Sequence, residues 1–127
     1  MSDVVVDASA ILALLNAEPG AEAVATRLPH AIISTVNLAE VVTRLAAVKM
    51  PEDEIRTVLG LLGLTTVEFD EAQAIQAGLF YPDTHSFGLS LGDRACLALA
   101  HHLQAPALTA DRVWRELGID VIVELIR

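Results

Sequence analysis

The chain has 127 residues, the size of one domain with a single sizeable core, and we expect residues 1–127 to form one domain. Its net charge of −9 excludes a general nucleic-acid coat protein, which would be basic. No apolar stretch approaches the ~18 residues of a membrane span. We do not expect the acidic start MSDVVVD to be a signal peptide, and the lone Cys96 cannot form an intrachain disulfide. We therefore expect a cytoplasmic protein with no membrane association.

The apolar fraction of 54% is above the roughly 45–50% that is usual, and Ala, Leu and Val supply most of it. Two interpretations remain open. The excess is either a surface that a partner covers, such as a dimer mate or another protein, or the mark of an Ala-rich helical protein.

The residues predict strands alternating with helices. In the first half of the chain we predict a strand at 4–6, helices at 8–16 and 21–28, a strand at 31–34, and helices at 36–48 and from 51 to about 63. In the second half we predict a strand at 65–69, a helix from 70 or 71 to about 80, a polar loop at 81–88 and a helix at 91–103. A strand at 107–109, a short helix at 112–117 and a strand at 121–123 complete the prediction. Such alternation predicts an α/β fold, with a parallel sheet covered on both faces.

Four separated acidic residues each lie beside a different apolar run: Asp7, Glu40, Asp93 and Asp111. Asp7 and Asp111 fall just after the first and fourth predicted strands, at the carboxyl ends where ligands bind in such sheets. If the fold gathers the four carboxylates, their mutual repulsion requires a cation, and oxygen ligands suit Mg²⁺ or Mn²⁺. Ser9 and Thr109 each lie two residues from an Asp and are placed to hydrogen-bond a carboxylate.

Each acid also has a simpler interpretation. Asp7 and Asp111 are suited to cap the helices that follow them. Asp93 lies three residues after Ser90, as in a capping box. Glu40 has Arg44 at i+4, which favours a surface ion pair.

The whole chain resembles the PIN-domain ribonucleases, in particular the VapC toxins of prokaryotic toxin–antitoxin pairs. The resemblance rests on Asp7 in VVVDASAILALL, Glu40 in STVNLAEVVTRL, Asp93 in LSLGDRACLALA and Asp111 in ALTADRVW. It implies a three-layer α/β/α sandwich with a parallel sheet of about five strands. It also implies Mg²⁺ or Mn²⁺ held by these four catalytic acids with Ser9 and Thr109 in support, and a homodimer inhibited by a cognate VapB-type antitoxin.

The expected function is therefore metal-dependent cleavage of RNA phosphodiester bonds. An RNA substrate requires a local basic rim, for which the candidates are Arg44, Lys49, Arg94, Arg112 and Arg115. One alternative is a non-catalytic PIN-like interaction module. A phosphoacceptor receiver domain is disfavoured, because it expects a lysine late in the chain and none follows Lys49.

Overall fold

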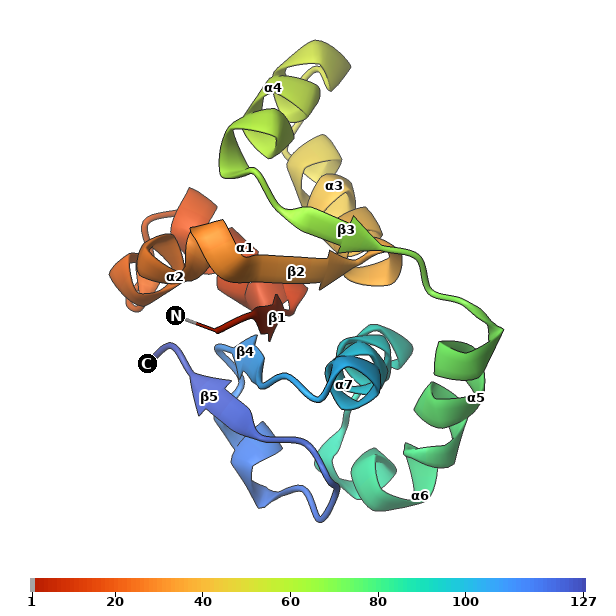
Figure 1. Ribbon diagram of the computed structural model, residues 1–127. Coiled ribbons are helices and arrows are strands. Elements are labelled where there is room, and N and C mark those ends of the chain that lie inside the picture. The colour runs from red at the N-terminus through yellow and green to blue at the C-terminus, as the bar shows by residue number, and fades with distance from the viewer. Residues whose placement is uncertain (1) are drawn as a thin grey trace.

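The computed structural model describes residues 2–127, which contain a five-stranded, all-parallel sheet. The strand order is β3-β2-β1-β4-β5, from top to bottom in Figure 1. The strands are β1 (Val4–Val6), β2 (Ala31–Ser34), β3 (Thr65–Val67), β4 (Ala107–Thr109) and β5 (Val123–Leu125). This confirms the predicted α/β class and the parallel sheet of about five strands.

Helices cover both faces of the sheet. The helices are α1 (Ala8–Leu15), α2 (Ala21–Arg27), α3 (Thr35–Ala47), α4 (Glu52–Leu62), α5 (Glu71–Leu79), α6 (Tyr81–Thr84) and α7 (Leu91–Leu103), with 3₁₀ turns η1 (Leu28–His30), η2 (His85–Phe87) and η3 (Arg112–Glu116). Alternate residues of a strand face opposite sides. Val4 and Val6 accordingly pack into the core under α1 to α4, whereas Val5 packs with Leu97 of α7 and Trp114 of η3.

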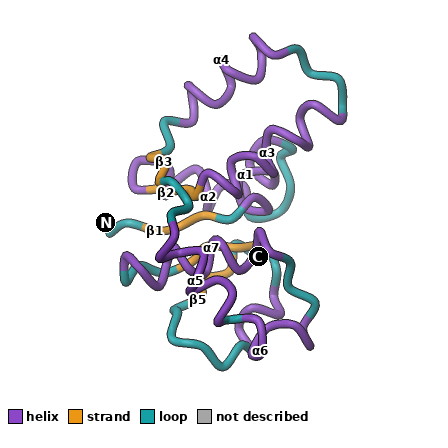
Figure 2. The backbone as a smooth tube through the Cα atoms, turned by 90° about the vertical axis from the view of Figure 1, so that its right-hand side faces the viewer, coloured by secondary structure: helices purple, strands orange, loops and turns teal. Residues whose placement is uncertain are grey.

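Helix α7 is the central helix of its layer. Its residues from Ala95 to Ala100 are all buried, and most of them are small, so the helix packs closely on the sheet. Helix α4 is the opposite case and projects from the rest of the molecule (Figures 1 and 2). Ile55 is its one buried residue, and Leu61 is 82% exposed.

Two sequence predictions are wrong. Residues 81–88 are not a loop but contain α6 and η2, because Pro82 sits in a first turn that tolerates proline and Thr84 Oγ1 donates to the Phe80 carbonyl over 2.8 Å. The last strand is Val123–Leu125, two residues later than predicted. Pairing with β4 sets this register, since Ile126 donates its N–H to the Thr109 carbonyl over 3.0 Å.

Other boundaries differ by one or two residues. The third strand ends at Val67, and the segment after Asp111 is a 3₁₀ turn that ends at Glu116. Pro51 precedes α4 as its N-cap, and Gly63 ends that helix in the left-handed conformation with φ 64°. Within residues 2–127, no helix is long and apolar enough to cross a membrane.

Candidate active site

A groove of about 570 Å³ opens at the carboxyl end of β1, between α1, α3 and α7. Its walls bring together three of the four predicted acids, Asp7, Glu40 and Asp93. Ser9 and Arg44 also line it. Parallel strands place their carboxyl ends at one edge of the sheet, and for this reason residues far apart in sequence meet there.

Asp7 lies directly after β1 and is only 4% exposed. Its Oδ1 accepts hydrogen bonds from Ser9 Oγ (2.7 Å) and from the Ala10 N–H (3.0 Å), and its Oδ2 accepts one from Thr109 Oγ1 (2.9 Å). Burial raises the pKa of Asp7 to about 6; the hydrogen bonds oppose this rise, and the charge of Asp93 adds to it. Asp7 is therefore the N-cap of α1 and also a buried carboxylate whose charged form is disfavoured.

Ser9 and Thr109 connect Asp7 to the end of β4. Ser9 Oγ accepts the Ala110 N–H over 3.0 Å, and Thr109 Oγ1 accepts the Asp111 N–H over 3.0 Å. Each hydroxyl thus donates to Asp7 and accepts from the backbone, which fixes its orientation. The two side chains hold the Asp7 carboxylate on both of its oxygens.

Asp93 lies in the first turn of α7. It forms a capping box with Ser90: the Ser90 N–H donates to Asp93 Oδ2 over 2.9 Å, and the Asp93 N–H donates to Ser90 Oγ over 3.2 Å. Burial raises the pKa of Asp93, and the charge of Asp111 raises it further, although the hydrogen bonds from Ser90 oppose both. The charge of Asp93 in turn raises the pKa of Asp7.

Glu40 is half-buried on α3. Its Oε1 accepts a hydrogen bond from Asn37 Nδ2 over 2.8 Å, and the same amide group donates to the Gly92 carbonyl over 2.9 Å. No ion pair joins Glu40 to Arg44 in the described part of the chain, so the i+4 interpretation is not realised. Asn37 and Gly92 were not among the predicted site residues. The position of Asn37 at i−3 from Glu40 is a local signal for it, whereas the role of Gly92 requires the approach of α3 to α7.

Asp111 is exposed and lies outside the walls of the groove. It caps η3 by accepting the Val113 N–H over 3.2 Å. Its link to the cluster is its backbone hydrogen bond to Thr109 and its effect on the pKa of Asp93. The structure therefore places Asp111 at the rim rather than at the centre.

The chemistry of the donors fits a hard divalent cation, since every side chain that the groove offers as a ligand is an oxygen donor. The raised pKa of Asp7 and the space that Gly92 leaves for the Glu40 carboxylate agree with this. As the side chains are placed, no three carboxylate, imidazole or thiol groups of residues 2–127 converge closely enough to enclose an ion. Hydrogen bonds hold the four carboxylates instead: Asp7, Asp93 and Asp111 accept helix-capping bonds, and Glu40 accepts one from Asn37.

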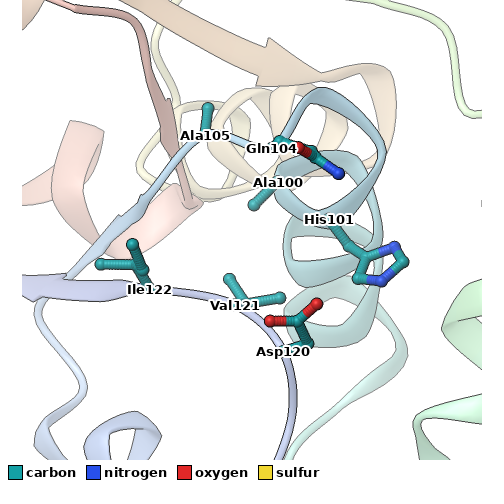
Figure 3. A pocket seen from close by; sticks show the side chains of 7 residues that line it. All are labelled: Ala100, His101, Gln104, Ala105, Asp120, Val121 and Ile122. Atoms are coloured by element: carbon teal, nitrogen blue, oxygen red, sulfur yellow. The ribbon is translucent and has the colours of Figure 1, made fainter.

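A second pocket of about 260 Å³ lies at the other end of α7 (Figure 3). His101 and Asp120 are its ionisable side chains, beside Gln104 and the apolar side chains of Val121 and Ile122. It holds one carboxylate rather than a group of them, and it offers no counterpart to the site at Asp7.

The PIN domain family matches residues 4–120, and the chain belongs to this family. No curated protein matches the chain. Three solved structures are similar to this chain. A DNA-bound VapBC complex from Salmonella typhimurium has 18% sequence identity and a TM-score of 0.78, and the match covers 100% of both chains. A toxin–antitoxin complex from Klebsiella pneumoniae has 20% identity and a TM-score of 0.73 over 96% of this chain and 97% of that one, and VapBC-1 from nontypeable Haemophilus influenzae has 19% identity and a TM-score of 0.75 over 97% of both. At these identities the structures show a shared fold.

Proposed function

We propose that this PIN-domain protein is a VapC-type toxin and a Mg²⁺- or Mn²⁺-dependent endoribonuclease. One observation carries the proposal: the buried carboxylate of Asp7 lies at the carboxyl end of β1, in a groove that Glu40 and Asp93 also line. Burying a carboxylate among others is costly. A divalent cation offsets that cost.

The proposed ligands are Asp7, Glu40 and Asp93, with Asp111 acting from the rim. These side chains would hold an ion that, when bound, would lower the pKa of a water molecule and offset the negative charge on a phosphodiester. Ser9 and Thr109 orient Asp7 through their hydrogen bonds to it. Among the predicted basic rim, Arg44 lines the same groove. Its guanidinium group makes no ion pair with any residue from 2 to 127, so it is available to an RNA phosphate.

The test is cleavage of structured RNAs, including transfer RNAs, by the purified protein freed of any antitoxin. We expect cleavage with Mg²⁺ or Mn²⁺ and none with EDTA. Cleavage that persists in EDTA would contradict a metal-dependent reaction. No cleavage of any RNA by folded protein that binds Mn²⁺ would favour a non-catalytic PIN-like module, which the helix-capping roles of Asp7, Asp93 and Asp111 also suit.

The proposal includes a VapB-type antitoxin, a homodimer and a cytoplasmic location, with residues 1–127 as one domain. The antitoxin is suggested by the similar VapBC complexes. The homodimer is suggested by large apolar side chains on the surface of α5, where Ile75 is 57% and Leu79 is 64% exposed one helical turn apart. Sedimentation of the purified chain should give the mass of two copies, and a monomer at micromolar concentration would contradict the dimer.

A further inference from the structure

Asn37 is a buried polar residue that links two helices of the groove. It is 1% exposed, and its Nδ2 donates both to Glu40 Oε1 and to the Gly92 carbonyl. Its Oδ1 is buried with no hydrogen-bond partner among residues 2–127. An unpaired buried carbonyl lowers stability. The Asn37 amide thus interacts with the described residues through its two donated bonds alone, and the bond to Oε1 orients the Glu40 carboxylate.

Gly92 lies in the first turn of α7 and faces the Glu40 carboxylate. A Cβ at residue 92 would lie 2.3 Å from Glu40 Oε2 and 2.6 Å from Cδ and Oε1. The same addition at Gly60, in α4, meets nothing within 4 Å. The Glu40 carboxylate thus occupies the space that a side chain at residue 92 would fill. The N-terminus of α7 attracts negative charge, which offsets part of the repulsion between carboxylates in this groove.

We propose that Asn37 and Gly92 are positioning residues that hold the Glu40 carboxylate against the first turn of α7, beside Asp93. This inference rests on the proposed function, since it assigns Glu40 an orientation that suits the divalent cation before that ion binds. Neither residue lines the groove or is one of the proposed metal ligands. Both act through Glu40: Asn37 by a hydrogen bond and Gly92 by leaving room.

Gly92→Ala separates this role from a purely structural one. The group that the new methyl displaces is the far end of a flexible side chain, which can swing toward solvent while the helices stay packed. Alanine also favours a helix over glycine. The variant should therefore fold with a thermal midpoint no lower than that of the wild type. Its affinity for Mn²⁺, measured by calorimetry, should fall about 10- to 100-fold, as when an orienting partner of a ligand is lost.

Gly60→Ala is the matched control, because it adds the same methyl group to a helix in open space; it should leave Mn²⁺ affinity unchanged. Asn37→Leu, which keeps the volume and removes the amide, should weaken Mn²⁺ binding as Gly92→Ala does. Val41→Ala, a buried change on the same helix, should lower the thermal midpoint without that loss. Wild-type affinity in Gly92→Ala would overturn the proposal.

The double variant Gly92→Ala/Glu40→Ala tests whether Gly92 acts through Glu40. The methyl should cause no further loss of Mn²⁺ affinity once the carboxylate is gone, and an equal loss in both backgrounds would overturn the proposal. If the wild type binds no Mn²⁺, the proposed function fails and thermal midpoints decide the inference. The methyl should then raise the midpoint more in the Glu40→Ala background than in the wild type; equal shifts would overturn it.

Discussion

Asp7→Asn should make the metal-free protein more stable near neutral pH while removing RNA cleavage. Burial raises the pKa of Asp7 from 3.8 to about 6, so the folded protein holds a charge near neutral pH that its surroundings disfavour. Asparagine has nearly the same shape and no charge, and its oxygen still accepts from Ser9 and Ala10. A buried group that lowers stability and lines a groove is expected at a functional site.

The direction of the Asp7 pKa shift determines whether stability rises or falls with pH. Between about pH 4 and pH 6 the folded state keeps a proton that the unfolded state has lost, so stability falls as pH rises through this window. The rise of the Asp7 pKa from 3.8 to about 6 corresponds to about 3 kcal/mol of folding stability, which is present below about pH 4 and lost above about pH 6. This net shift already includes the hydrogen bonds that Asp7 accepts, but the amide NH₂ that replaces Oδ2 opposite the Thr109 hydroxyl costs about 1 kcal/mol. The net gain expected for Asp7→Asn above about pH 7 is about 2 kcal/mol.

Urea denaturation in EDTA from about pH 4 to about pH 8 measures this gain. The difference between Asp7→Asn and the wild type should grow with pH, whereas Asp83→Asn, on the surface of α6, should show no such trend. Mn²⁺ should then raise the thermal midpoint of the wild type and not that of Asp7→Asn. RNA cleavage should fall more than about 100-fold, which exceeds the loss typical when a residue that only orients a metal ligand is replaced. A less stable variant near neutral pH, or one that cleaves RNA, would contradict the prediction.

Where local sequence and tertiary packing favour the same structure, the elements were predictable. The β-branched run Val4–Val6 is a strand buried on both faces, and the apolar run Leu91–Leu103 is a buried helix, both with the predicted bounds. The last strand was less determined, because four of the five residues from 121 to 125 are apolar and the sequence marks no clear start. Hydrogen bonds to β4, a distant segment, select Val123–Leu125. Helix α6 was missed because its proline and polar residues also suit a loop.

The candidate site shows the same division. The sequence alone places Asp7 and Asp111 just after the first and fourth strands, and the structure shows that these strands, β1 and β4, are neighbours. It does not decide whether Glu40 bonds to Asn37 at i−3 or to Arg44 at i+4, because both lie on one helix face. Gly92 precedes Asp93 in the sequence, but its role requires α3 and α7 to approach each other, and no local pattern specifies that distance.

Asp93 is the acid for which capping and metal binding compete most directly as explanations, and two variants separate them. Ser90→Ala removes the acceptor for the Asp93 N–H and keeps the carboxylate. It should lower stability by about 1 kcal/mol, as N-cap losses do, and leave RNA cleavage within a few-fold of the wild type. Asp93→Asn keeps an oxygen for the Ser90 N–H and removes the charge.

Asp93→Asn should therefore retain its stability, because the half-buried charge and its repulsion with Asp7 and Asp111 are relieved. Its RNA cleavage should nevertheless fall more than about 100-fold, more than the loss of an outer partner causes. Urea denaturation and a cleavage assay on both variants measure the two effects independently. A carboxylate that only caps α7 predicts the reverse: both variants would keep their cleavage, and stability alone would change. Opposite responses of stability and cleavage in the pair would assign Asp93 to the site as well as to the helix.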